Sequence, residues 1–153
     1  MTQVQVFCIN YIPNNPHYDF KLMINSDKYQ DTLFLYNDDI ENRTSSLVTK
    51  YTKGNAIIRK YNSFNNNLIK PRSAGIVTGS LKTKGFTTLD KKNIDLIDQS
   101  FSLIEFIIKE HKYHKVIFSG DKNNFIGSNI FNLNHEIKIY ITQKIWDLNK
   151  IYI

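Results

Sequence analysis

Short apolar runs separated by polar stretches predict strands in this chain. Residues 4–9 and 115–118 have the length and composition of buried strands, and residues 32–36 are apolar on both faces, as in the centre of a sheet. Residues 20–24 and 74–77 are similar short runs and predict two further strands. The pattern therefore favours a sheet as the centre of the fold.

Two longer stretches in the second half of the chain predict amphipathic helices. Residues 91–110 carry apolar residues at spacings of three and four, and Asp90 can cap the first turn. Asn134 can cap a second helix that runs to the C-terminus. Strands that alternate with helices indicate an α/β fold with a mixed, mostly parallel sheet between helical layers. The apolar face of the second helix contains Ile137, Ile141, Ile145 and Leu148.

The length and composition predict one globular domain. The chain has 153 residues and 41% hydrophobic residues, which argues against a disordered chain. We expect residues 1–30 to be an N-terminal extension that adds an edge strand or covers a ligand site. Asn and Lys are abundant, a bias typical of AT-rich genomes such as those of some phages, giant viruses and low-GC bacteria.

The formal net charge of +6 favours an anionic partner, either a nucleotide or a nucleic acid. A lysine-rich surface set by codon bias is the alternative explanation. The sequence has no dense Lys/Arg run and no RNP-like strand motif, so nucleic-acid binding is the weaker of the two interpretations.

The single cysteine, Cys8, lies in an apolar run and is expected to be a buried structural thiol. Because one cysteine cannot form an internal disulfide, an intracellular protein is favoured. No apolar stretch approaches the length of a membrane span, and no signal peptide is recognisable. The expected location is the cytoplasm, that of the host if the protein is viral, with no membrane partner.

Polar residues directly follow the predicted central strand. Asn37, Asp38 and Asp39 stand where ligands bind in open α/β sheets, beyond the carboxyl ends of strands. Their amide and carboxylate groups can hydrogen-bond a ribose hydroxyl or an adenine amine. A plain Asx turn is the alternative.

Two further segments carry candidate ligand residues. In GNAIIR, Gly54 and Asn55 precede a helical run whose free N–H groups suit a pyrophosphate, and Arg59 can reach a phosphate or a carboxylate. The alternative is an ordinary helix start with a surface arginine. In KPRSAGIVTGS, Arg72 and Thr78 flank a short strand.

A second polar segment, SGDKNNFIGSNIF, follows the strand at residues 115–118. Glycine allows the backbone to approach a ligand closely, so this segment predicts a second wall of the same site. Its candidate ligand residues are Ser119, Gly127, Ser128 and Asn129.

Familiar catalytic motifs, such as a nucleophile elbow, a Walker loop or HExxH, do not occur in this sequence. His111 and His114 have a spacing that a metal could use, but their place at a helix end favours a surface position near the helix dipole. We therefore expect neither a metal site nor a cofactor.

The order of these motifs resembles a small macro-domain-like group common in phages. Its members show FGDN, GxGGQAxIR and NAxGIPTK, then a helix and a GIGTG loop. LYNDD, KGNAIIR, SAGIVTG and IGSNIF match in that order over residues 32–148. The chain departs from the pattern at four glycine or lysine positions. These are Asn37 for the glycine of FGDN, Gly54 for the double glycine, Gly79 for the lysine and Asn129 for the second glycine of GIGTG.

The resemblance implies a macro-like three-layer sandwich with a pocket for ADP-ribose or a related nucleotide. It implies that Asn37 and Asp38 lie near the base or ribose. It also implies phosphate contacts in two segments, which contain Gly54, Asn55 and Arg59 and then Gly127, Ser128 and Asn129.

Three functions stay open at this point. The first is a binding module for ADP-ribose or an NAD-derived or cyclic signalling nucleotide, with which a phage or virus would sequester a host immune signal. The second is a hydrolase of ADP-ribosyl or nucleotide linkages, in which Asp38, Asp39 or Asp121 orients a water. The third is a basic nucleic-acid-binding protein with steeply salt-dependent affinity. A homo-oligomer is compatible with each.

Overall fold

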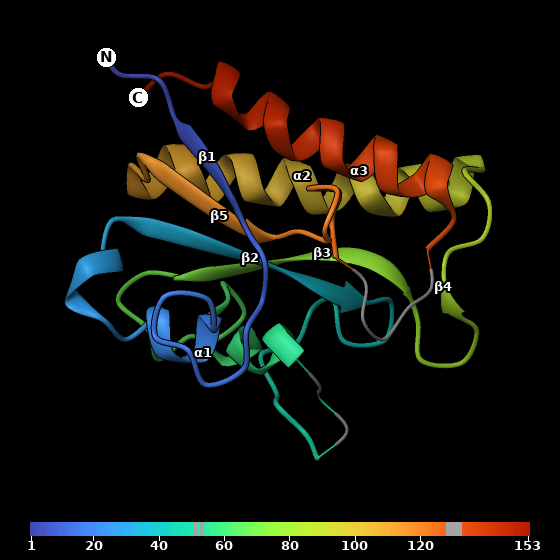
Figure 1. Ribbon diagram of the computed structural model, residues 1–153, viewed down its shortest axis with the longest axis horizontal. Coiled ribbons are helices and arrows are strands. Elements are labelled where there is room, and N and C mark those ends of the chain that lie inside the picture. The colour runs from blue at the N-terminus through green and yellow to red at the C-terminus, as the bar shows by residue number, and fades with distance from the viewer. Residues whose placement is uncertain (51, 53, 128–132) are drawn as a thin grey trace.

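A mixed, mostly parallel sheet forms the middle layer of the structure (Figure 1). The computed structural model describes residues 1–50, 52, 54–127 and 133–153. Within these residues the sheet has five strands in the order β1-β5-β2-β3-β4, all parallel except β4. The α/β fold class is thus confirmed. The strands are β1 (Gln5–Ile9), β2 (Thr32–Asp39), β3 (Ser73–Ser80), β4 (Lys84–Gly85) and β5 (Lys115–Ser119).

Helices cover both faces of the sheet, which makes the fold a sandwich (Figure 1). The long helices α2 (Lys91–His111) and α3 (His135–Asp147) lie on one face, and η3 (Leu148–Lys150) continues α3. Both predicted caps are confirmed, since Asp90 accepts from Asn93 N and Asn134 accepts from Glu136 N. The opposite face carries the short helices α1 (Phe20–Met23), η1 (Asp27–Tyr29) and η2 (Gly54–Tyr61).

The central strand β2 is buried on both faces because its side chains alternate between the two helical layers. Leu33 and Leu35 belong to the core cluster that includes α2 and α3. Phe34 and Tyr36 belong to the second cluster, with α1 and η2. The strand is therefore the common wall of two cores, as its uninterrupted apolar sequence predicts.

The prediction of a strand at residues 20–24 is wrong, because this segment forms α1. Phe20, Met23 and Ile24 are buried at helical spacing and pack on the second core cluster. Asp19 caps the helix by accepting from Lys21 N at 3.2 Å. A segment this short, with Lys21 among its apolar residues, fits either periodicity, and here the cap and the core favour the helix.

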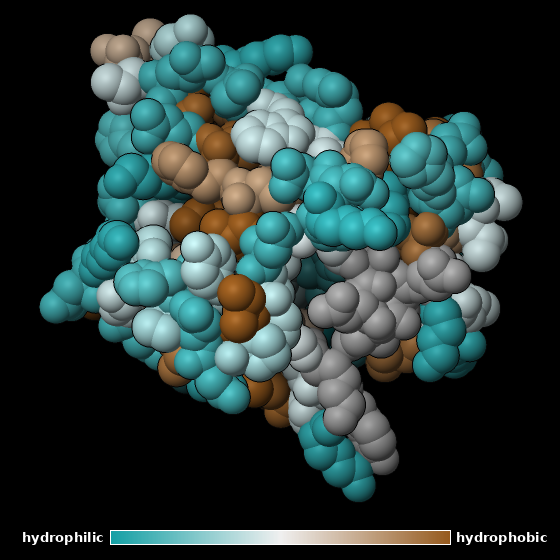
Figure 2. All heavy atoms as spheres, viewed as in Figure 1, coloured by the Kyte–Doolittle hydropathy of each residue, from teal (hydrophilic) through white to brown (hydrophobic). Residues whose placement is uncertain are grey.

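The N-terminal segment adds β1 at one edge of the sheet, beside β5. The chain ends meet there, since Thr2 N donates to Ile153 O at 2.7 Å. Figure 2 shows apolar side chains gathered over β1, where Phe7 is 41% exposed. Cys8 lies on the same strand and is half-buried, not fully buried as predicted. No helix in the described ranges has the length and apolar character needed to cross a membrane.

The sheet splits between β2 and β5 at its carboxyl edge. β5 pairs with β1 over its whole length, but it pairs with β2 only at Thr32, Leu33 and Phe34. Beyond Phe34, β2 stays paired with β3 as far as Asp39. Because these strands are parallel, their carboxyl ends lie at the same edge, and the divergence opens a space there.

Candidate functional site

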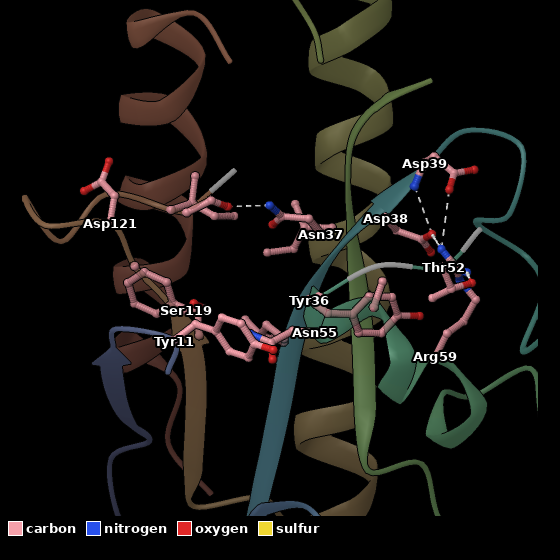
Figure 3. A pocket seen from close by; sticks show the side chains of 18 of the residues that line it. Tyr11, Tyr36, Asn37, Asp38, Asp39, Thr52, Asn55, Arg59, Ser119 and Asp121 are labelled. Carbon is pink, nitrogen blue, oxygen red and sulfur yellow. Dashed lines mark hydrogen bonds and ion pairs between the residues drawn. The ribbon is translucent and has the colours of Figure 1, made fainter. Parts of the chain in front are cut away.

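A cavity of about 550 Å³ occupies the space between the diverging strands (Figure 3). This volume lies within the range of small-molecule sites. The floor is apolar and includes Leu35, Ile76 and Phe118, while most of the rim is polar. The site is a topological switch point, because the chain continues from β2 to β3 on one side while β5 and β1 lie on the other.

The cavity brings together most of the residues that the sequence singles out as a ligand site. Two segments about eighty positions apart in sequence, the end of β2 and the loop after β5, form facing walls, and the start of η2 closes a third side. The predicted residues on these walls are Asn37, Asp38, Asp39, Gly54, Asn55, Arg59, Ser119, Asp121 and Gly127.

A buried ion-pair cluster forms one wall. Arg59, on η2, places Nη2 2.7 Å from Oδ1 of Asp38 and 3.4 Å from Oδ2 of Asp39. The side chains of Arg59 and Asp38 are only 4% and 3% exposed. Nη1 donates to Leu47 O and to Thr52 Oγ1, both at 3.4 Å. A charge this buried needs its partners, so the guanidinium is fixed in place by the two carboxylates.

Burial shifts the ionisation of the groups in this cluster. It raises the pKa of Asp38, and the neighbouring Arg59 only partly offsets the rise. Burial, followed by the charge of Asp38, also raises the pKa of the Tyr36 hydroxyl. For Arg59 the effect of burial is opposed by Asp38, and the net pKa is raised. The cluster therefore contains a permanent cation, a protonated phenol and one carboxyl group that titrates closer to neutrality than usual.

The other two carboxylates predicted to orient a water are held by local hydrogen bonds. Asp39 Oδ1 accepts from N and Nδ2 of Asn42, each at 2.9 Å. Asp121 Oδ1 accepts from the backbone N–H groups of Asn123 at 2.8 Å and Phe125 at 3.1 Å. Burial alone would raise the pKa of Asp121, but these N–H groups and Lys138 lower it overall.

Asp121 also lies apart from the other two. Figure 3 shows it across the cavity from Asp38 and Asp39, with its carboxylate turned away from them. The structure thus brings Asp38 and Asp39 together and leaves Asp121 in a loop-forming role, where its Oδ2 pairs with Lys138 at 3.4 Å.

The start of η2 offers backbone and amide groups to the cavity. Gly54 has φ +56°, the left-handed region that favours glycine, and an added Cβ would meet no atom within 4 Å. Asn55 Oδ1 is buried without a hydrogen-bond partner in the described part of the chain. The GNAIIR segment is a 3₁₀ helix, so the predicted helix start is present in its tighter form.

A side-chain bridge joins the two facing walls. Asn37 Nδ2 donates to Gly127 O, which links the end of β2 to the loop after β5. Gly127 N donates to Ser119 O at 2.9 Å. At Gly120 a Cβ would lie 2.3 Å from Cys8 Sγ, so a larger residue in this loop would require the Cys8 side chain or the loop to move.

Sequence reasoning missed several residues on the cavity wall, among them Asn10, Tyr11, Lys122 and Lys138. Asn10 Nδ2 donates to Gly120 O at 3.0 Å and to Asp121 O at 2.9 Å, which fixes the segment that carries Tyr11. Asn10 follows an apolar strand directly, so the signal used for Asn37 could have found it. Lys122 lies in the polar segment after β5 that the sequence already predicts as a wall, whereas Lys138 reaches the site from α3 through tertiary packing that no local pattern encodes.

Two predicted ligand residues lie away from the cavity. Arg72 precedes β3, at the amino end of the sheet, where it donates to Tyr29 O at 2.6 Å and Ile24 O at 3.1 Å. Thr78 is fully buried within β3, and its Oγ1 donates to Asp38 O at 3.4 Å. Strand β3 continues beyond its predicted end, which places Thr78 inside the sheet. Ser128 and Asn129 lie outside the described residues.

No protein-family model matches this chain, and no curated protein or solved structure matches it either. The arguments about function therefore rest on the geometry and chemistry of the cavity itself.

Proposed function

We propose that this protein binds ADP-ribose, or a related NAD-derived or cyclic signalling nucleotide, in the cavity at the carboxyl edge of the sheet. One observation carries the proposal: two polar strand-end segments face each other across a cavity of about 550 Å³ at the switch point of a parallel sheet. The apolar floor and the few convergent polar groups are typical of a small-molecule site.

An aromatic side chain on the cavity wall suits the base of the nucleotide. Tyr11 lines the cavity and makes no hydrogen bond or ring contact with other residues in the described ranges, so its ring is available for stacking. Stacking of a base on an aromatic ring contributes about 1–3 kcal/mol. Asn55 lines the same cavity, and its side-chain amide can recognise the edge of a base held there (Figure 3).

The charged groups suit a sugar and its phosphates. Asp38 and Asp39 can accept hydrogen bonds from ribose hydroxyls or from an exocyclic amine. The backbone at Gly54 and Asn55, at the start of η2, can donate to a phosphate oxygen. Lys122 and Lys138 add positive charge on the facing wall, and the net charge of +6 attracts an anionic ligand from solution.

Retention of such a nucleotide would be sufficient for a biological effect. In a phage or a virus, a protein that binds a host immune signal and does not release it would keep that signal from its receptor. This counter-defence role is part of the proposal and requires affinity, not turnover.

A second candidate is hydrolysis of an ADP-ribosyl or nucleotide linkage at the same site. The observation that favours it is Asp38, a carboxyl group on the cavity wall whose pKa is raised by burial. In this reaction the water oxygen bonds to the anomeric carbon while the bond to the leaving group breaks. Asp38 accepts the proton of the water, and the leaving group takes the bonding electron pair.

Thermal-shift assays and calorimetry with ADP-ribose, its cyclic forms, NAD and cyclic dinucleotides test the proposal. We expect at least one of them to stabilise the protein, since a ligand that binds only the native state raises the free energy of unfolding. Chromatography of the recovered ligand then separates the two candidates: an intact ligand supports binding alone, and a converted ligand supports the hydrolase. If no nucleotide stabilises the protein, the proposal is wrong.

Tyr11→Ala and Tyr18→Ala form a matched pair for locating the site. Tyr18 is 40% exposed and does not line the cavity. We expect Tyr11→Ala to weaken nucleotide binding roughly tenfold or more, from the loss of stacking, and Tyr18→Ala to leave it unchanged. Equal affinities in the two variants would show that the base does not bind at Tyr11.

A further inference from the structure

A second, smaller cavity of about 170 Å³ lies at the outer edge of β3. It exists because β4 pairs with β3 only at Gly79 and Ser80, which leaves the earlier part of this edge without a neighbouring strand. Helix α2, the loop after η2 and the loop after β2, with Arg43 and Thr44, form the remaining walls, and all of the lining residues belong to the described part of the chain.

The exposed edge of β3 presents a backbone donor and a backbone acceptor to this cavity. Arg72 O accepts from Phe34 N, so Arg72 faces β2, whereas Val77 N donates to Ser100 Oγ at 3.1 Å and faces outward. By strand alternation, the N–H and C=O groups of Gly75 also point away from β2. Gly75 is only half-buried and lines the cavity.

A carboxylate oxygen lies beside this backbone. Oδ1 of Asp38 accepts from Arg59 Nη2 at 2.7 Å and from Asp39 N at 2.9 Å, while Oδ2 accepts no hydrogen bond from any described residue. Oδ2 is also the atom nearest to the position of a Cβ on Gly75, at 2.7 Å. The side chain of Asp38 is 3% exposed and lines both cavities, so its free oxygen is an acceptor in an otherwise enclosed place.

The rest of the cavity is mainly apolar. Its apolar lining residues include Leu96 and Leu103 on α2, Val77 on β3 and Phe64 in the loop after η2. Walls of this kind accept a flat apolar group, but the two backbone groups and the carboxylate require polar partners at one end. The matching ligand has an N–H for Asp38 Oδ2, an oxygen for Gly75 N–H and an uncharged aromatic body. An anionic ligand would bring a second negative charge beside the Asp38 carboxylate and has no N–H to donate to Oδ2. Arg43, the cation that also lines this cavity, donates through Nη1 to Ile40 O.

We propose that the second cavity binds a small aromatic primary carboxamide, for which nicotinamide and benzamide are the probes. This inference goes beyond nucleotide binding in the main cavity, with which the second cavity shares only Tyr36 and Asp38. A primary carboxamide provides the donor and the acceptor on one planar group, and a single aromatic ring suits the apolar residues of the wall.

The test is a titration of the full chain with nicotinamide, benzamide and benzoate, followed by amide chemical shifts in NMR. We expect both carboxamides to shift resonances of β3 and α2, and benzoate to bind at least tenfold more weakly because of Asp38. Absence of carboxamide binding, or benzoate binding as strong as that of benzamide, would overturn the proposal.

Tryptophan substitutions on α2 locate the site. Leu103→Trp fills the cavity from its wall, and Gln99→Trp fills it from an exposed rim position that tolerates a large side chain. Phe106→Trp is the matched control, because Phe106 is on the same helix, 61% exposed and outside the cavity. We expect a loss of nicotinamide binding of at least tenfold in Gln99→Trp and Leu103→Trp, and no change in Phe106→Trp.

Nicotinamide binding that survives Gln99→Trp would place the carboxamide elsewhere and overturn the assignment, even if Leu103→Trp does not fold. Nucleotide binding by Gln99→Trp is measured in parallel and should equal that of the unmodified chain. The carboxamide titration is read without any nucleotide, so a failure of the proposed nucleotide binding leaves its outcome unaffected.

Discussion

Two arginines that the sequence predicts as ligand residues have opposite environments in this molecule. Arg59 lies at the carboxyl end of β2, against the carboxylates of Asp38 and Asp39 and on the wall of the main cavity. Arg72 lies at the amino end, where it donates to the backbone carbonyls of Tyr29 and Ile24. Each has a buried Nε without a partner among the described residues.

The difference shows how the acceptors of an arginine indicate its role. Backbone carbonyls are neutral. By donating to carbonyl groups at the ends of α1 and η1 and at the start of β2, Arg72 joins these three elements. Carboxylates are charged and costly to bury, so Arg59 makes possible an acidic wall that a ligand can use. From the sequence alone, both residues are predicted to bind a ligand. Only Arg59 lies on a cavity.

The largest effect is expected for Arg59→Met, which keeps the side-chain length and removes the charge. Asp38 and Asp39 would then be buried without a cation, and loss of one partner of a buried pair costs about 3–5 kcal/mol. Urea denaturation at neutral pH measures the change in the free energy of unfolding. The double variant with Asp38→Asn should recover part of the loss. A change below about 1 kcal/mol would show that the pair is not buried as described.

Arg72→Met should cost less, about 1–3 kcal/mol, because it removes hydrogen bonds to neutral acceptors. Its nucleotide affinity, measured by calorimetry where the variant is folded, should equal that of the unmodified chain. A fall in nucleotide affinity in folded Arg72→Met would contradict the different roles that the structure gives to the two arginines.

The helices show which parts of the fold can be predicted from the sequence and which cannot. The two long helices and their caps, Asp90 and Asn134, are predictable because a stripe with helical spacing needs many positions to agree. The apolar segment at Phe20 cannot be told from a strand by its pattern, because so short a run has no resolvable period. Its cap, Asp19, is the signal that could have identified the helix.

The main cavity is predictable in part, through polar residues that follow apolar strands. That rule identifies Asn37 and Ser119, and it could have identified Asn10. It cannot separate Arg59 from Arg72, because the end of the sheet at which a loop residue lies depends on strand order. Nor can it find Lys138, which reaches the cavity from a helix through tertiary packing.

The titration of Asp38 gives a smaller and more specific prediction. Its pKa is raised in the folded state, so the native protein holds this proton more tightly than the unfolded chain does. The stability of the unmodified chain should then fall, relative to Asp38→Asn, as the pH rises from the ordinary aspartate value through the raised one. A tenfold difference in proton affinity between the two states corresponds to about 1.4 kcal/mol. Unfolding free energies of both proteins between pH 3 and about 8 test this; a constant difference would contradict it.

The smallest effect on stability is expected at an exposed ion pair whose N–O distance is similar to that between Arg59 and Asp38. Lys91 Nζ lies 3.0 Å from Asp95 Oδ2 on α2, but the two side chains are 89% and 50% exposed. Lys91→Ala should change the free energy of unfolding by about 0.5 kcal/mol or less, because water screens the pair and a lysine in the first helical turn opposes the helix dipole. Thermal denaturation at low and high salt measures it. A cost comparable to that of Arg59→Met would mean that distance, and not burial, sets the strength of ion pairs in this protein.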